Sequence, residues 1–186
     1  MSVLYGDGSR TFSFEQQSAT VAPGDVVTLQ SALSSIATQA TAQDVFIFVA
    51  SNHGGPDYQG SGCTLWCWND CATVTASYFS GLCSGIPCSR QIYILGQCNS
   101  GGFIPSLRSA SRLVMTACED TEESYPTADG TYDEFLLRIA EGIEGGAQNF
   151  AQVFFHAQQA DTQVEHPQIA DDGGIANDST ILQTAQ

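Results

Sequence analysis

Two apolar runs in this chain each end shortly before a reactive side chain and a pair of glycines. Residues 45–50 (VFIFVA) precede His53 and its glycines, and residues 92–95 (IYIL) precede Cys98 and a second glycine pair. Continuous apolar runs of this kind are typical of strands that are covered on both faces of a parallel sheet. If the two strands are parallel neighbours, the imidazole and the thiol emerge at one sheet edge, where open α/β folds place their sites. The pattern therefore predicts a site with a cysteine nucleophile.

The rest of the chain alternates between helix-like and strand-like segments. Periodic apolar residues or turn signals predict helices at 23–40, 72–82, 100–109, 132–145 and 150–160, and further strands at 2–5, 112–117 and 181–182. Thr20 or Asp25 is the expected N-cap of the first helix. The segment 165–178 reads as a loop. Strands that alternate with helices predict an α/β fold with a mostly parallel sheet and helices on both faces.

The length of the chain sets its domain organisation. A chain of 186 residues is long enough for one sizeable core and too short for two ordinary domains, so we expect a single domain over 1–186. No stretch reaches the roughly 20 apolar residues that span a bilayer. The N-terminus lacks the basic and apolar regions of a signal peptide. Because Met1 directly precedes an apparent strand, we expect a mature region or a part of a longer chain.

The net charge limits the partners of the protein. There are 20 Asp and Glu residues against 5 Lys and Arg residues, which gives a formal charge of -15. Such a charge repels nucleic acid and anionic membrane surfaces, and it attracts basic peptides. We therefore expect a peptide or protein substrate, and neither a nucleic acid nor a membrane as a partner.

The cysteines are concentrated between the two apolar runs. Five of the seven lie there, namely Cys63, Cys67, Cys71, Cys83 and Cys88. The spacing of the first three is compatible with a metal site, but no histidine is near them and the total is odd. Disulfides among the five are therefore expected in preference to zinc. Disulfides form in oxidising compartments, so we expect a secreted or extracytoplasmic protein.

The chemistry of His53 and Cys98 has two interpretations. A thiol becomes a good nucleophile when an imidazole or a helix N-terminus favours the thiolate. The glycines after Cys98 allow a close backbone approach, and backbone N–H groups, including that of Gly54, can stabilise an oxyanion. Alternatively, Cys98 is a buried structural thiol and His53 is a loop histidine. Their placement after two similar strands favours the catalytic interpretation.

Three ordered sequence blocks resemble the legumain-like cysteine peptidases, which are relatives of caspases, metacaspases and gingipains. The first two are His53-Gly54-Gly55 and Cys98 before Ser100-Gly101-Gly102. The third is residues 116–120 (TACED) followed by Glu123-Ser124-Tyr125, which is similar to the segment that lines the primary specificity pocket in that group. His166-Pro167-Gln168 also stands where many bacterial members have a Pro-Gln pair. The resemblance covers the chain from Val3 onward.

This resemblance implies a fold and a mechanism. The fold is a caspase-like three-layer α/β/α sandwich, in which the first β-α unit of the family has no counterpart before Val3. That unit holds an asparagine that orients the histidine in legumain. His53 is implied as the catalytic imidazole and Cys98 as the nucleophile of a cysteine endopeptidase. The backbone N–H groups of Gly54 and Cys98 are implied as the oxyanion hole.

The resemblance also bears on specificity. Gly96 replaces the acidic residue that legumain carries two positions before its nucleophile. Asp120 occupies a position similar to the pocket aspartate of metacaspases, so we expect a basic residue at P1, the residue before the cleaved bond. Ser124 is expected to bind substrate as well, and the acidic residues of the same loop are further candidates, namely Glu119, Glu122 and Glu123.

Several alternatives stay open at this point. An acyl-enzyme is resolved by an amine as readily as by water, so a transpeptidase is a rival, and an inactive homologue that only binds peptides is another. No cofactor is expected. Calcium remains an option because some metacaspases need it, although Asp171, Asp172 and Asp178 miss the EF-hand spacing. Packing or surface roles are expected for three other residues, Cys118, His156 and His166.

Overall fold

A four-stranded sheet forms the centre of the molecule. The computed structural model describes residues 1–9, 12–14, 17–19, 21–59 and 62–183. The strand order is β11-β10-β9-β5. The three strands β5 (Val45–Ala50), β9 (Arg90–Leu95) and β10 (Arg112–Thr116) are parallel, and β11 (Gln168–Asp171) runs antiparallel to β10. Ala50, Leu95 and Thr116 are in register, so the parallel strands end at one edge.

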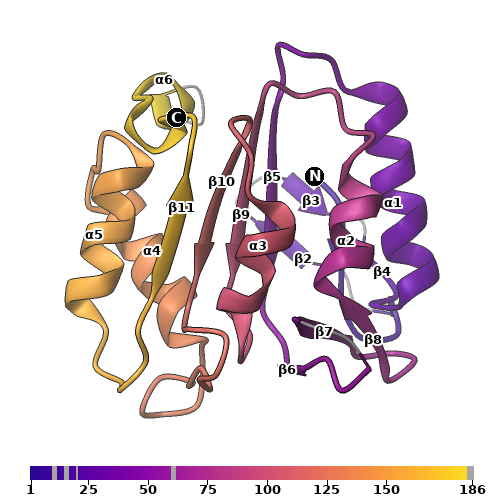
Figure 1. The fold of residues 1–186 in the computed structure, drawn as a ribbon, viewed down its shortest axis with the longest axis horizontal. Coiled ribbons are helices and arrows are strands. Elements are labelled where there is room, and N and C mark those ends of the chain that lie inside the picture. Colours follow the sequence, from indigo (N-terminus) through magenta and orange to yellow (C-terminus); the bar gives the residue numbers. More distant parts are fainter. Residues whose placement is uncertain (10–11, 15–16, 20, 60–61, 184–186) are drawn as a thin grey trace.

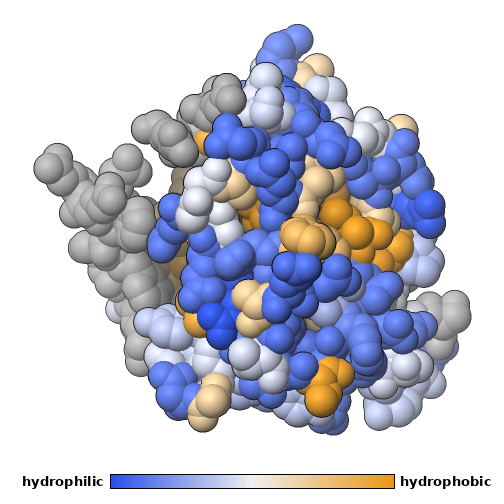
Figure 2. All heavy atoms as spheres, turned by 90° about the vertical axis from the view of Figure 1, so that its left-hand side faces the viewer, coloured by the Kyte–Doolittle hydropathy of each residue, from blue (hydrophilic) through white to orange (hydrophobic). Residues whose placement is uncertain are grey.

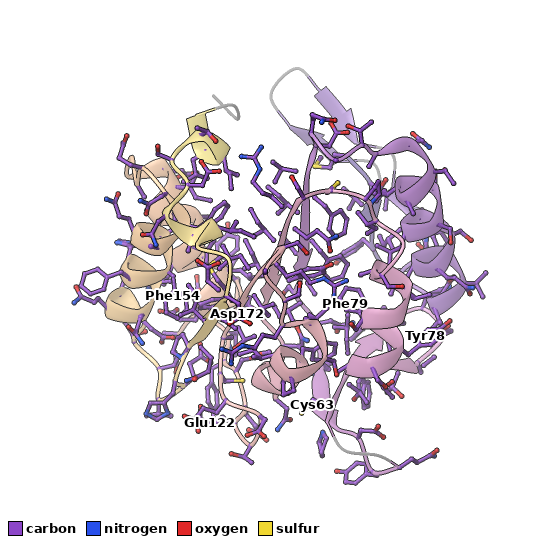
Figure 3. The ribbon with its side chains drawn as sticks, turned by 45° about the horizontal axis from the view of Figure 1, so that its top comes forward. Cys63, Tyr78, Phe79, Glu122, Phe154 and Asp172 are labelled. Carbon is purple, nitrogen blue, oxygen red and sulfur yellow. The ribbon has the colours of Figure 1, made fainter. Side chains whose placement is uncertain are left out.

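Helices cover both faces of this sheet (Figure 1). On one side lie α1 (Val26–Gln39), α2 (Ala76–Cys83) and the short α3 (Ile104–Leu107), and on the other lie α4 (Glu134–Glu144) and α5 (Phe150–Ala160). Alternate residues of β9 point to opposite layers: Tyr93 packs with the first set of helices and Ile94 with the second. Figure 3 labels one buried aromatic residue of each core, Phe79 and Phe154. The predicted three-layer α/β fold is confirmed.

Side-chain caps fix where the helices begin. Asp25, Thr75, Asp133 and Asn149 cap α1, α2, α4 and α5, and each accepts a hydrogen bond from a backbone N–H of the first turn. Such caps satisfy donors that would otherwise lack a partner within the helix. Asp25 is therefore the cap of the first helix, and the other candidate, Thr20, lies outside the described residues.

Smaller sheets and turns complete the described part of the chain. β1 (Val3–Leu4) pairs in parallel with β4 (Val21–Ala22), and β2 (Phe12–Phe14) pairs with β3 (Gln17–Ala19). β6 (Gly54–Pro56), β7 (Cys63–Cys67) and β8 (Ala72–Thr75) form an antiparallel sheet beside the end of β5. The remaining elements are η1 (Ser100–Phe103), η2 (Ile175–Asn177) and α6 (Thr180–Gln183).

Three predicted segments outside the candidate site differ from the structure. The expected loop 165–178 contains β11, which has a single buried residue, Ala170, and so lacks the apolar run on which the prediction depended. The expected strand 181–182 lies in α6, because Ile181 is buried against the α5 side while the hydroxyl and N–H of Thr180 bind Asp178. The helix expected from 72 begins at Ala76, because 72–75 is paired with β7.

All seven cysteines are free thiols, so the structure contains none of the predicted disulfides. Cys63 and Cys67 stand at the two ends of one strand, β7, which keeps them apart. Cys63 packs against Gly102, whereas Cys83 lies beside Tyr93 in the core under α2. The clustering of these residues in sequence therefore reflects several separate positions in space.

The face of the molecule formed by α4 and α5 is mainly hydrophilic. Figure 2, which faces the side formed by α4 and α5 in Figure 1, shows small apolar patches separated by polar side chains. Phe155 and Val164 are among the exposed apolar residues, at 58% and 80%. Within the described part of the chain, no helix has both the length and the apolar content to cross a bilayer.

Candidate active site

His53 and Cys98 leave the sheet at equivalent positions. Ala50 of β5 and Leu95 of β9 are direct partners in the parallel register, and each reactive residue is the third one after its strand. The imidazole and the thiol therefore belong to adjacent loops at the same edge of the sheet, as the sequence predicts. The pairing of the two apolar strands thus also places the His53 loop next to the Cys98 loop.

The two loops are in direct contact through a glycine. A Cβ atom on Gly54 would collide with the carbonyl oxygen of Cys98, and it would lie 2.7 Å from Cγ of Gln97. A residue with a side chain cannot take this position without moving one loop away from the other. Gly54 therefore permits the approach of the His53 loop to the Cys98 loop.

Ser124 contacts the thiol from the third loop, which follows β10. Its backbone N–H lies 3.4 Å from Sγ of Cys98, and Sγ lies 3.6 Å from its carbonyl oxygen. The Ser124 hydroxyl donates to the carbonyl of Gly96 at 2.6 Å, which ties this loop to the end of β9. The structure thus brings Ser124 to Cys98.

The backbone after Cys98 turns sharply. Asn99 has a left-handed conformation (φ 57°), its N–H donates to the carbonyl of Glu122 at 2.7 Å, and its side chain donates to the carbonyl of Asp120 at 2.8 Å. The helix predicted at 100–109 is reduced to the 3₁₀ turn η1 and the single turn α3. A helix this short contributes little dipole, so individual N–H groups are the relevant donors here.

His53 stands between two tryptophans that received no role in the sequence analysis. Its ring centroid is 6.0 Å from that of Trp66, in an edge-on arrangement, and 6.2 Å from that of Trp68, with the planes only 22° apart. The backbone is fixed as well, since the N–H of Trp66 donates to the carbonyl of His53 at 3.0 Å. Asn52 reinforces this pairing through a hydrogen bond from its side chain to the carbonyl of Trp66 at 2.9 Å.

A further acidic residue, Asp133, lies beside the nucleophile loop. A Cβ on Gly96 would collide with the carboxylate of Asp133, so this carboxylate occupies the space of the side chain that Gly96 lacks. Burial raises the pKa of Asp133 to about 6, although hydrogen bonds from Leu136 N–H and the Ser51 hydroxyl oppose the shift. No sequence pattern indicated Asp133 as a site residue, because its only local signal is its position as a helix cap.

Glu165 extends this acidic region. One of its carboxylate oxygens accepts the N–H of Tyr125 at 2.9 Å, while the other is buried with no hydrogen-bond partner among the described residues. Burial, followed by the charge of Asp161, raises its pKa. In the part of the chain that the structure describes, no arginine forms an ion pair with Asp133 or Glu165.

The predicted pocket residues Glu119 and Asp120 lie on another side of the Cys98 loop. Both are exposed. They line a shallow groove whose other residues are Gly101, Ile104, Pro105 and Gln168. Glu122 does not line this groove. Its carboxylate accepts a hydrogen bond from the backbone N–H of His166 and binds the ring of the same residue (Figure 3 labels Glu122). That contact raises the pKa of His166.

The remaining candidates occupy separate positions. Cys118 is buried, with Sγ 3.5 Å from the Ser100 hydroxyl, and burial raises the pKa of its thiol. His156 lies on α5, 3.9 Å from Glu141. The three aspartates considered for calcium have protein partners: Asp171 accepts two N–H groups of η2, Asp172 pairs with Arg108, and Asp178 pairs with Arg90. No group of three potential metal ligands occurs among the described residues.

Comparisons with known proteins agree with this architecture. The model of the peptidase C13 family matches residues 14–168. A search of curated protein sequences finds no match to this chain. A structural-genomics target protein from Geobacter sulfurreducens is similar in structure, with a TM-score of 0.64 and 12% identity over 85% of this chain and 80% of that chain. Caspase-1 from Spodoptera frugiperda gives a TM-score of 0.61 and 13% identity over 82% and 70%, which shows a shared fold.

Proposed function

Because the chain belongs to the peptidase C13 family, we propose that it is a cysteine endopeptidase with Cys98 as nucleophile and His53 as general acid. The observation that carries the proposal is the register of Ala50 with Leu95, which delivers both side chains to one sheet edge. The contact of Gly54 with the carbonyl of Cys98 supports it, because it holds the two loops together. A cysteine peptidase-type protein is already indicated by the family and the fold.

In the proposed reaction, the Cys98 thiolate attacks the carbonyl carbon of the peptide bond. The N–H groups of Gly54 and Cys98 stabilise the oxyanion of the tetrahedral intermediate. When the C–N bond breaks, His53 gives its proton to the leaving amine, and a thioester remains on Cys98. Water then attacks the thioester and returns a proton to His53, which releases the acid and the thiolate. An amine in place of water would give transpeptidation.

We further propose a basic P1 residue. The support is electrostatic: Asp133 stands next to the nucleophile loop, and Glu119 and Asp120 border its other side. Carboxylates favour a guanidinium or an ammonium group in such positions. The net charge of -15 adds a long-range attraction for basic substrates.

A panel of fluorogenic peptides with Arg, Lys, Asn or Asp at P1 tests the activity. We expect thiol-dependent turnover that falls by at least about 10³-fold in Cys98→Ala and in His53→Ala. Cys71→Ala is the matched control, because Cys71 is an exposed thiol on the turn between β7 and β8. If no substrate is turned over in a Cys98-dependent way, the protein is not a peptidase, and the inactive homologue becomes the correct description. Added amine acceptors reveal transpeptidation through a ligated product.

Two neutral substitutions test the specificity. Asp133→Asn preserves the cap of α4, since asparagine is an equally good N-cap, and removes only the charge. Asp120→Asn does the same in the groove. If Asp133 or Asp120 supplies the charge that binds the P1 side chain, its variant should lower kcat/KM for Arg substrates by at least about tenfold relative to Asn substrates. Equal preference for Arg and Asn in the unmodified enzyme would contradict the basic P1 proposal.

A further inference from the structure

The aromatic side chains next to His53 are unusually accessible. Trp66 is 46% exposed and Trp68 is 63% exposed, and both contact the same imidazole. We call Trp66 and Trp68 the tryptophan pair. Scattered apolar residues on a surface are common, but large aromatic residues that gather at one point mark a binding site. The proposed mechanism uses neither indole.

The β6-β7-β8 sheet determines where this pair lies relative to the nucleophile loop. The start of β7 touches that loop, because Cys63 packs against Gly102. Trp66 is three residues further along β7, near its other end, and pairs there with the backbone of His53. The tryptophan pair therefore lies beside His53 at the end of β7 that is remote from Gly102.

The chemistry of the leaving group connects this position to the substrate. His53 donates its proton to the amine that departs, and this nitrogen belongs to the first residue after the cleaved bond. The side chains of that residue and of the next one therefore lie close to the imidazole. Ring centroids at 6.0 and 6.2 Å from the imidazole place both indoles within reach of these side chains.

We propose that the tryptophan pair binds an apolar side chain in the first two residues after the cleaved bond. Rigid aromatic rings offer a large contact area at a low entropic cost, and Trp66 is already fixed by its bonds to His53 and Asn52. A cationic side chain is disfavoured here, because His53 is an imidazolium at the moment when it acts as the acid. The site thus selects large aliphatic or aromatic residues. This inference rests on the proposed function.

Two internally quenched peptides with the same residues before the cleaved bond test the proposal. One continues with Leu-Leu and the other with Gly-Gly. We expect the unmodified enzyme to prefer Leu-Leu by about tenfold in kcat/KM, and Trp66→Ala and Trp68→Ala to reduce this preference to less than about threefold. Cleavage of the Gly-Gly peptide should fall by a smaller factor than cleavage of the Leu-Leu peptide, and Trp68→Phe should keep most of the preference. Tyr58→Ala is the matched control, since Tyr58 is an aromatic residue of the segment after β6 that is 92% exposed.

If both peptides lose the same factor in the tryptophan variants, or if neither peptide is affected, the preference for Leu-Leu is unchanged and the proposal is wrong. An equal loss would show that the indoles only position His53.

A binding measurement separates this inference from the proposed activity. Trp66 and Trp68 are the only tryptophans in the sequence, so intrinsic fluorescence reports directly on the pair. In the Cys98→Ala variant, the Leu-Leu peptide without its quencher should change the emission at a concentration at least about tenfold lower than the Gly-Gly peptide does. This result is expected even if the protein has no peptidase activity. Equal effects of the two peptides would refute the apolar site.

Discussion

The backbone N–H of Ser124 approaches Sγ of Cys98 to 3.4 Å, while the hydroxyl of the same serine donates to the carbonyl of Gly96. One residue thus contacts the nucleophile and fastens its own loop to the end of β9. The loop after β10 is therefore a structural part of the candidate site, in addition to the loops of His53 and Cys98. It makes the position of the thiol depend on three neighbouring strands.

Removal of the Ser124 hydroxyl should loosen this arrangement. Ser124→Ala keeps the N–H but loses the hydroxyl's bond to Gly96 and its 3.9 Å contact with Sγ of Cys98, so we expect a cost of about 1 kcal/mol in the free energy of unfolding. Alkylation of Cys98 by iodoacetamide should slow about two- to fivefold at fixed pH, because the N–H is no longer held at the sulfur. Ser89→Ala is the control, since that hydroxyl also binds a single backbone carbonyl, that of Ala42, away from the site. Equal alkylation rates in all three proteins would contradict the role of Ser124.

Two adjacent glycines offer a sharper comparison. A Cβ at position 54 meets the carbonyl of Cys98, whereas a Cβ at position 55 has its first neighbour, the Thr64 hydroxyl, at 4.0 Å. We therefore expect Gly54→Ala to separate the His53 and Cys98 loops and to lower kcat/KM by about 10²-fold, as displacements of about 1 Å do in other enzymes. Gly55→Ala should retain activity within about threefold. Similar losses in the two variants would show that the contact with Cys98 is not what makes Gly54 necessary.

The sequence predicted most of the features that depend on long apolar patterns. The strands of His53 and Cys98, their parallel alignment, the two helical layers and the family resemblance are all confirmed by the structure and the family match. These features are predictable because a buried parallel strand must be apolar on both faces. The catalytic roles of His53 and Cys98 remain predictions.

The features that the sequence did not reveal depend on tertiary contacts. β11 is a short edge strand with one buried residue, so its pairing is visible only once β10 is in place. Asp133 reaches the nucleophile loop because Gly96 leaves space for it, which no local pattern indicates. The ring contacts of His53 depend on the pairing of Trp66 with the residue before β6. Likewise, cysteines that are close together in the sequence do not have to be close together in space.

The buried carboxylates give the protein a specific response to pH. Burial raises the pKa of Asp133 from its usual 3.8 to about 6, so the folded protein binds its proton more tightly than the unfolded chain does. The part of the free energy of unfolding that this proton contributes is lost as pH rises from about 4 to about 6. Glu165 and His166, whose pKa values are also raised, contribute in the same direction.

Urea unfolding at pH 5 and pH 8 measures this response. We expect the protein to be more stable at pH 5, by at least the roughly 1.4 kcal/mol that corresponds to one pKa unit. Asp133→Asn should reduce the difference, since the amide cannot ionise and still caps α4. Asp57→Asn is the control, because Asp57 lies in the loop that follows β6, away from α4. Higher stability at pH 8 than at pH 5 would contradict the burial of these groups.

The thiols provide a test of the cysteine arrangement. Cys63 and Cys67 are separated by about 13 Å along β7, which is too far for a disulfide. Burial also raises the pKa values of Cys63, Cys67 and Cys83 to about 11, so these thiols are almost fully protonated near pH 7. Without reductant, iodoacetamide should therefore modify only Cys71 and Cys98 rapidly in the native protein, and all seven cysteines after denaturation. The Cys71→Ser variant should show one fast adduct fewer. An intact mass with five adducts in the denatured protein would instead reveal one disulfide. That result would support the disulfide pairing that the clustering of the cysteines in sequence predicts.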